Sequence, residues 1–210
     1  GEGSMKATLF TKWRSFARIS VAAAVFTAVF ATQPALVQAA DYPHSTKGWL
    51  QACQKVGRKL TKHSFTYGIR SRDTLKEGIE HGRKANCAAY VSWCLQEFGV
   101  VGEGDTLYTK GGKLVTRFDT WQRRVKIIKV KKKAGKVTNL KPGDIVGWKD
   151  IVHMNIYAGE NSYGEKLWLD GGSAATAPGR PRRYYRANQI LPYNYLDNHK
   201  ISFIIRIKGL

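Results

Sequence analysis

The sequence predicts an α+β fold in which N-terminal helices pack on an antiparallel β-sheet. Helical spacing of apolar residues is confined to two early segments, 46–59 and 87–98. The second half instead holds consecutive short apolar segments separated by turns rich in glycine and proline. Helices followed by closely connected strands are typical of this class, because strands joined by short turns pair in opposite directions.

The first forty residues read as a leader. Residues 1–4 are predicted to be a vector-derived remnant before Met5, and residues 5–39 a secretory signal peptide. Basic residues come first, an apolar run follows at 19–31, and Val37-Gln38-Ala39 suits signal peptidase. The apolar run is shorter than the ~20 residues that span a membrane. We therefore expect no stable membrane span and a secreted domain at 40–210, with a retained N-terminal anchor as the alternative.

The charge balance predicts polyanionic partners. The chain has 35 basic and 15 acidic residues, of which 31 and 14 follow residue 40. A charge this large attracts anionic polymers, and for an exported protein these are peptidoglycan and other anionic wall polymers or the membrane surface. Nucleic acid is the competing partner, but no motif of a common nucleic-acid module is present. We expect a monomer that binds no nucleic acid.

Two helices are expected before the sheet. The first runs from a cap at Ser45 or Thr46 to Lys59, with Trp49 and Val56 in its apolar stripe. The second spans 87–98 between an N-cap at Asn86 and a stop at Gly99. Its apolar face consists of Cys87, Tyr90, Val91, Cys94, Leu95 and Phe98.

Cys87 is the candidate nucleophile because it opens the second helix. Unpaired N–H groups and the helix dipole at that end stabilise a thiolate. The small side chains of Ala88 and Ala89 would let a substrate carbonyl approach the sulfur. The alternative is that Cys87 is only a small buried apolar residue.

The other two cysteines, Cys53 and Cys94, are expected to be buried free thiols, with a disulfide between them as the alternative. An odd cysteine count in a secreted chain leaves at least one thiol free or paired between molecules. The chain has no CxxC motif, and its cysteine spacings do not suit structural zinc. No metal and no cofactor is predicted.

Residues 61–85 read as polar and irregular, followed after the cysteine helix by a short strand at 113–115. Asp119 is predicted to cap a short helix through Trp121, and a strand is expected at 125–130. The lysine-rich stretch 126–136 is interpreted as a solvated edge strand and turn, since lysine on an edge blocks unwanted pairing. A dedicated polyanion site is the alternative.

Four strands complete the chain, at 145–148, 151–158, 167–170 and 201–207. Alternation places His153 and Asn155 on the face of their strand opposite Met154. Asp170 lies on the next strand, across the hairpin turn at 159–164, where cross-strand neighbours are ~4.5–5.5 Å apart at Cβ.

Together with Cys87, His153 and Asp170 form a candidate nucleophile, base and orienting acid. Taken singly, His153 is better explained as a partly exposed strand histidine and Asp170 as a turn residue, and only the three residues together favour a triad.

In its motifs the chain resembles the NlpC/P60 cysteine peptidases of bacterial cell walls, papain-like enzymes to which the CHAP amidases are related. The shared motifs are Asn86-Cys87-Ala88-Ala89, Leu140-Lys141-Pro142-Gly143-Asp144 and His153-Met154-Asn155-Ile156-Tyr157-Ala158-Gly159. Asp170 stands where the family has its third polar residue, and Tyr67 where it often has a tyrosine that points at the cysteine. Asn86, Ala88 and Ala89 replace the family's usual Asp, Ser and Gly.

The resemblance implies that residues 40–210 are a wall-associated catalytic domain with a papain-like core. It also implies hydrolysis of peptidoglycan stem peptides through a thioester, at a γ-D-glutamyl bond or at the glycan–alanine amide. Cys87, His153 and Asp170 would be catalytic, while Tyr67, Asn86 and Ala88 would contribute to the oxyanion and substrate sites. Two alternatives remain: an acyltransferase on the same scaffold, or a non-catalytic cationic module that binds the wall.

Overall fold

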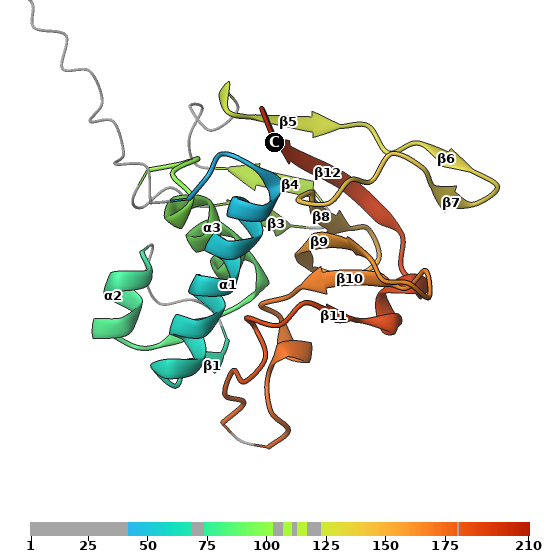
Figure 1. Cartoon of the computed structure of the whole chain (residues 1–210). Helices are drawn as coiled ribbons and strands as arrows, with labels where there is room; N and C mark the ends of the chain where they lie inside the picture. Colours follow the sequence, from blue (N-terminus) through green and yellow to red (C-terminus); the bar gives the residue numbers. More distant parts are fainter. Residues whose placement is uncertain (1–41, 69–73, 103–106, 111–112, 117–122, 180) are drawn as a thin grey trace, which may run out of the picture. The chain divides into compact units, whose positions relative to one another are not determined.

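The computed structural model describes residues 42–68, 74–102, 107–110, 113–116, 123–179 and 181–210. Helices come first and the long strands last (Figure 1). The elements are α1 (Thr46–Lys62), β1 (Thr66–Tyr67), α2 (Leu75–Glu80), β2 (Lys84–Ala85), α3 (Cys87–Glu97), β3 (Leu107–Lys110), β4 (Lys113–Thr116), β5 (Val125–Ile128), β6 (Lys132–Lys133), β7 (Lys136–Val137), β8 (Ile145–Trp148), β9 (Met154–Glu160), β10 (Lys166–Leu169), η2 (Ser173–Ala175), β11 (Leu191–Pro192), η3 (Asn194–Asn198) and β12 (Ile201–Ile207).

Six strands form the main sheet, in the order β11-β10-β9-β8-β12-β5. Every neighbouring pair in it is antiparallel. The predicted α+β class with an antiparallel sheet is confirmed, and β8 and β12 have the predicted bounds. β5 is the edge strand that its lysines predicted.

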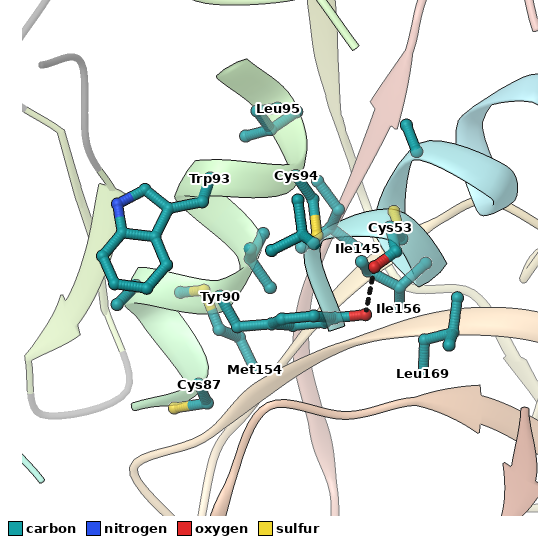
Figure 2. Packing of buried hydrophobic residues seen from close by; sticks show 14 of the residues in the cluster. Cys53, Cys87, Tyr90, Trp93, Cys94, Leu95, Ile145, Met154, Ile156 and Leu169 are labelled. Atoms are coloured by element: carbon teal, nitrogen blue, oxygen red, sulfur yellow. Dashed lines mark hydrogen bonds between the residues drawn. The ribbon is translucent and has the colours of Figure 1, made fainter. Parts of the chain in front are cut away.

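The sheet is buried on both faces. Helices α1 and α3 pack on one face, where Met154 and Ile156 of β9 join the same apolar cluster as Cys53 and Tyr90 (Figure 2). A second apolar cluster lies on the opposite face of the sheet and includes Tyr157 of β9 and Leu196 of η3. Tyr157 alternates along β9 with the residues of the first cluster. The predicted alternation along β9 is therefore confirmed.

Both predicted helices form, with local caps that explain their starts. Ser45 accepts a hydrogen bond from Gly48 N–H at the start of α1, and Asn86 accepts one from Ala89 N–H at the start of α3. Helix α3 is buried on more than the predicted stripe, because Ser92 and Trp93 are also covered. The Trp93 ring packs edge-on against Phe65, with ring centroids 5.7 Å apart.

Several sequence expectations were wrong in detail. Residues 61–85 are not irregular throughout: they contain α2, whose capping box pairs Thr74 with Glu77, and the parallel pair β1–β2. Strand β3 pairs with β4 but was not expected. Strand β9 begins at Met154, so His153 directly precedes the strand. The helix expected from Asp119 lies outside the described residues.

Within the part of the chain that is described, no helix combines the length and apolarity needed to cross a membrane.

Candidate functional site

Cys87 is the first residue of α3, and its side chain is 7% exposed. The side chain of Asn86 caps this end of the helix by accepting the N–H of Ala89 at 3.0 Å. Figure 2 shows Cys87 at the end of α3, apart from the two core thiols of Cys53 and Cys94. An α-helix leaves its first N–H groups without helical acceptors. The N–H groups of Cys87 and Ala88 thus lie beside the sulfur.

His153 and Asp170 form a buried pair across the β9–β10 hairpin. His153 Nε2 lies 2.8 Å from Asp170 Oδ2, and the carboxyl group is fully buried. The other carboxylate oxygen accepts the N–H of Gly172. Asn155 Nδ2 donates to Oδ2 at 3.5 Å, and Trp148 Nε1 in turn donates to Asn155 Oδ1 at 3.1 Å. The carboxylate is therefore held on both oxygens.

This environment favours the charged forms of the pair. Burial would lower the pKa of His153, but the Asp170 carboxylate and its hydrogen bond, with a smaller contribution from Cys87, raise the pKa to about 10. For Asp170, burial would raise the pKa, but the neighbouring imidazolium and the hydrogen bonds from Gly172 and Asn155 hold it below the usual value. At neutral pH the pair is an imidazolium and a carboxylate.

Cys87 lies next to the same imidazole. A hydrogen bond and a charge interaction with Cys87 both contribute to the raised pKa of His153. Since Nε2 is engaged by Asp170, Nδ1 is the ring nitrogen that remains for the sulfur. The structure thus brings the three predicted residues together, although Cys87 is far in the chain from the other two.

Two glycines shape the position of the ring. A Cβ at Gly172 would lie 2.5 Å from His153 Cε1 and 3.2 Å from Nδ1. A Cβ at Gly171 would collide with the side chain of Tyr90 on α3. This tight approach brings the residues after β10 against both the imidazole and the cysteine helix.

Tyr184 connects the segments that carry the nucleophile and the acid. Its hydroxyl lies 2.8 Å from Ala85 O, two residues before Cys87, and 2.7 Å from Gly171 O, directly after Asp170. The hydroxyl donates its single proton to these two carbonyl oxygens. Its ring is buried, and burial, followed by the charges of Cys87 and Asp170, raises the pKa of Tyr184. The tyrosine thus holds the start of α3 against the end of β10.

Tyr67 and Tyr195 stand at the exposed side of the site. Tyr67 is 38% exposed, and burial, then the charges of Cys87 and Asp170, raise its pKa. Tyr195 of η3 has its pKa raised by burial and then by Asp170. Tyr67 also pairs with Ala85, two residues before Cys87, in the β1–β2 sheet.

A groove of about 440 Å³ opens beside these residues. Ser173, Thr176, Arg182 and Tyr195 contribute to its walls. Ser173 directly follows Gly172, and the charge of Arg182 acts on Tyr67. The groove thus runs from Ser173, next to the glycine that packs on the imidazole, to a guanidinium, which suits a substrate with a carboxylate.

Cys53 and Cys94 are free, buried thiols, as predicted. Burial, and then the neighbouring Cys94, raises the pKa of Cys53. Among the described residues, no group of three or more histidine, cysteine, aspartate or glutamate side chains could hold a metal ion.

Sequence reasoning missed Asn155, Tyr184, Tyr195 and the steric role of the two glycines. Asn155 had a signal, because it shares a strand face with His153. Tyr184 had none, since its partners are 99 and 13 residues away in the chain.

Comparisons with protein-family profiles, with curated proteins and with solved structures found no match to this chain.

Proposed function

We propose that the protein is a secreted cysteine amidase or endopeptidase with a papain-like core, which cleaves peptidoglycan stem peptides. The observation that carries the proposal is the buried His153–Asp170 pair in contact with Cys87 at a helix start. Nucleophile, base and orienting acid in hydrogen-bond reach are what covalent acyl transfer requires. The motifs shared with the NlpC/P60 enzymes support the choice of substrate.

In the proposed first step, Cys87 Sγ attacks the carbonyl carbon of the scissile amide as a thiolate, because the proton already resides on Nδ1 of the His153 imidazolium. The N–H groups at the start of α3, together with the Tyr67 hydroxyl, donate to the developing oxyanion. One such donor is worth ~10²–10³ in rate. His153 then gives its proton to the leaving nitrogen, the C–N bond breaks, and a thioester remains.

In the second step, the neutral His153 takes a proton from the water that attacks the thioester. The C–S bond then breaks and releases the carboxylic acid and the Cys87 thiolate beside the imidazolium. Asp170 keeps the imidazole in one orientation through both steps, because it holds Nε2 while Nδ1 faces the sulfur. Arg182 in the groove would bind a free carboxylate, a group that stem peptides carry.

The test incubates the protein and its Cys87→Ala variant with purified peptidoglycan and measures released amines and fragment masses. Cys94→Ala is the matched control, because it makes the same change lower on the same helix. We expect release by the wild type and by Cys94→Ala, and none by Cys87→Ala. Absence of release by the wild type, or release by Cys87→Ala, would contradict the proposal. An added amine acceptor that appears in the products would instead indicate an acyltransferase.

A further inference from the structure

The most concentrated charge of the described residues lies away from the site. Between residues 123 and 141 the chain has nine lysines and arginines and no aspartate or glutamate. We define residues 129–139 as the basic arm, which consists of the β6–β7 hairpin and its base. Its five lysines are all exposed: Lys129, Lys131, Lys132, Lys133 and Lys136. Figure 1 shows the hairpin extending away from the main sheet.

Protection of the sheet edge does not explain the arm. Lysine on an edge strand prevents pairing with other chains, and this accounts for Lys126 on β5. Among the described residues, however, strands β6 and β7 pair only with each other, and they lie outside the six-stranded sheet. Each is two residues long, which leaves little edge to protect.

The hairpin also keeps an unfavourable local arrangement. Lys133 lies directly opposite Lys136, and like charges in this position destabilise a hairpin. Between them, Ala134 and Gly135 both have positive φ, 48° and 79°, as a two-residue hairpin turn requires. An anion bound between the lysines would relieve their repulsion.

The arm is nevertheless held in place at its base. Asn139 donates from Nδ2 to Lys129 O at 2.8 Å and accepts the N–H of Lys131 at 3.0 Å. Its own carbonyl accepts from Arg206 of β12, whose guanidinium is paired with the buried Asp144. The lysines are therefore presented on an anchored hairpin, which reduces the entropy lost on binding.

We propose that the basic arm binds a linear phosphodiester polymer without bases, of the polyol-phosphate type. Residues 123–141 contain no aromatic side chain, so they offer no platform on which nucleic-acid bases stack. They also lack the apolar face with which a membrane-surface segment enters the lipid boundary, since Ile127 is their one large exposed apolar side chain. Strand β5, where the arm begins, is three strands from β9, about 14 Å at the usual strand spacing. Binding there leaves the cysteine site open.

The experiment measures binding of lipid-free poly(glycerol phosphate) to the protein at several salt concentrations. The test variant replaces Lys131, Lys132, Lys133 and Lys136 with glutamine. The matched control replaces four exposed lysines elsewhere, Lys47, Lys62, Lys76 and Lys200, and so removes the same net charge. We expect the arm variant to bind roughly 10–100-fold more weakly and to lose roughly two to three from the slope of log K against log salt. The control should stay within about twofold of wild type.

Equal losses in the two variants would show that diffuse charge binds the polymer and would overturn the proposal. So would tighter binding of single-stranded DNA of equal phosphate count, or of phosphatidylglycerol vesicles. Binding is measured in the Cys87→Ala background as well, where no turnover is expected. The proposal for the basic arm can therefore be overturned while the amidase proposal stands, and the amidase proposal can be overturned while the proposal for the arm stands.

Discussion

The described part of the protein contains two histidine–aspartate pairs of similar length and very different surroundings. His153 and Asp170 are 2.8 Å apart, with side chains 11% and 0% exposed. His199 and Asp150 are 3.1 Å apart, with side chains 28% and 41% exposed. Asp170 also receives hydrogen bonds from Gly172 and Asn155, whereas Asp150 receives one from the backbone N–H of Lys200.

The difference shows that the residue types alone do not make a reactive site. Water screens an exposed ion pair, so its interaction energy is small. In the buried pair, the same interaction is screened much less and a sulfur lies against the imidazole. The four predictions below test this contrast, from the largest expected effect to the smallest.

The first prediction replaces each aspartate by asparagine. Asp170→Asn removes the carboxylate that holds the imidazole and its charge, so we expect hydrolysis of stem peptides to fall roughly 10²–10⁴-fold. Asp150→Asn is the matched control and should stay within about twofold of wild type. Steady-state rates on soluble fragments make the comparison. Comparable losses in the two variants would contradict a special role for the buried pair.

The second prediction concerns stability at alkaline pH. The pKa of His153 is about 10 in the folded protein, against ~6.5 in an unfolded chain. Protonation therefore favours folding: this contribution is complete below pH ~6.5 and is lost as the pH rises to about 10. Asp170 has a lowered pKa, so its contribution is present above pH ~3.9 and is lost in acid.

Denaturant unfolding of the wild type and of His153→Gln checks this prediction. The free energy of unfolding of the wild type should fall more steeply with alkaline pH than that of the variant. Should His153→Gln not fold, an NMR titration of the wild-type imidazole replaces it. A ring that titrates near pH 6.5 would contradict the prediction.

The third prediction tests the hydroxyl that joins the two halves of the buried site. Tyr184→Phe leaves the buried Gly171 carbonyl oxygen without this donor, at a cost of about 1–3 kcal/mol in the free energy of unfolding, while Ala85 O still accepts the N–H of Gly68. Because the cysteine and the imidazole are then less well aligned, we expect kcat to fall roughly tenfold while KM is unchanged. The neighbouring, exposed Tyr185→Phe is the control and should alter neither. A loss of stability with an unchanged kcat would show that Tyr184 stabilises the fold without aligning the cysteine and the imidazole.

The fourth and smallest effect is expected at the exposed histidine. His199→Gln removes an ion pair that water screens, so activity should stay within about twofold of wild type and the thermal midpoint should be unchanged. The ring of His199 packs edge-on against Tyr195 at 6.3 Å, and glutamine keeps part of that contact. A large loss of activity would show that the exposed pair supports the groove, and the two pairs would then differ less in function than we expect.

Local patterns were sufficient for much of the fold. Helices α1 and α3 begin at side-chain caps, and β8 and β12 are short apolar segments between turns, so each depends on neighbours in the chain. Helix α2, with six residues, and the two-residue strands β1 and β2 are too short to show a period. Contacts with distant segments decide their conformation.

The candidate site also has features that local patterns predict and features that depend on contacts between distant segments. Cys87, His153 and Asp170 were identifiable because each stands at a recognisable place in a helix, a strand or a hairpin. That Cys87 faces the imidazole depends on α3 packing on β9, and the Tyr184 hydrogen bonds and the close approach of Gly172 depend on the loops after β10.

The sequence alone determined that helices precede the strands of the main sheet, how side chains alternate along β9, where positive charge concentrates and which few residues are candidates for chemistry. These are properties of neighbouring residues. Only the tertiary structure decided which histidine–aspartate pair is buried, which ring nitrogen meets the sulfur and what holds the pair in place. Burial and hydrogen-bond partners come from segments distant in the chain, whose approach the folded core determines.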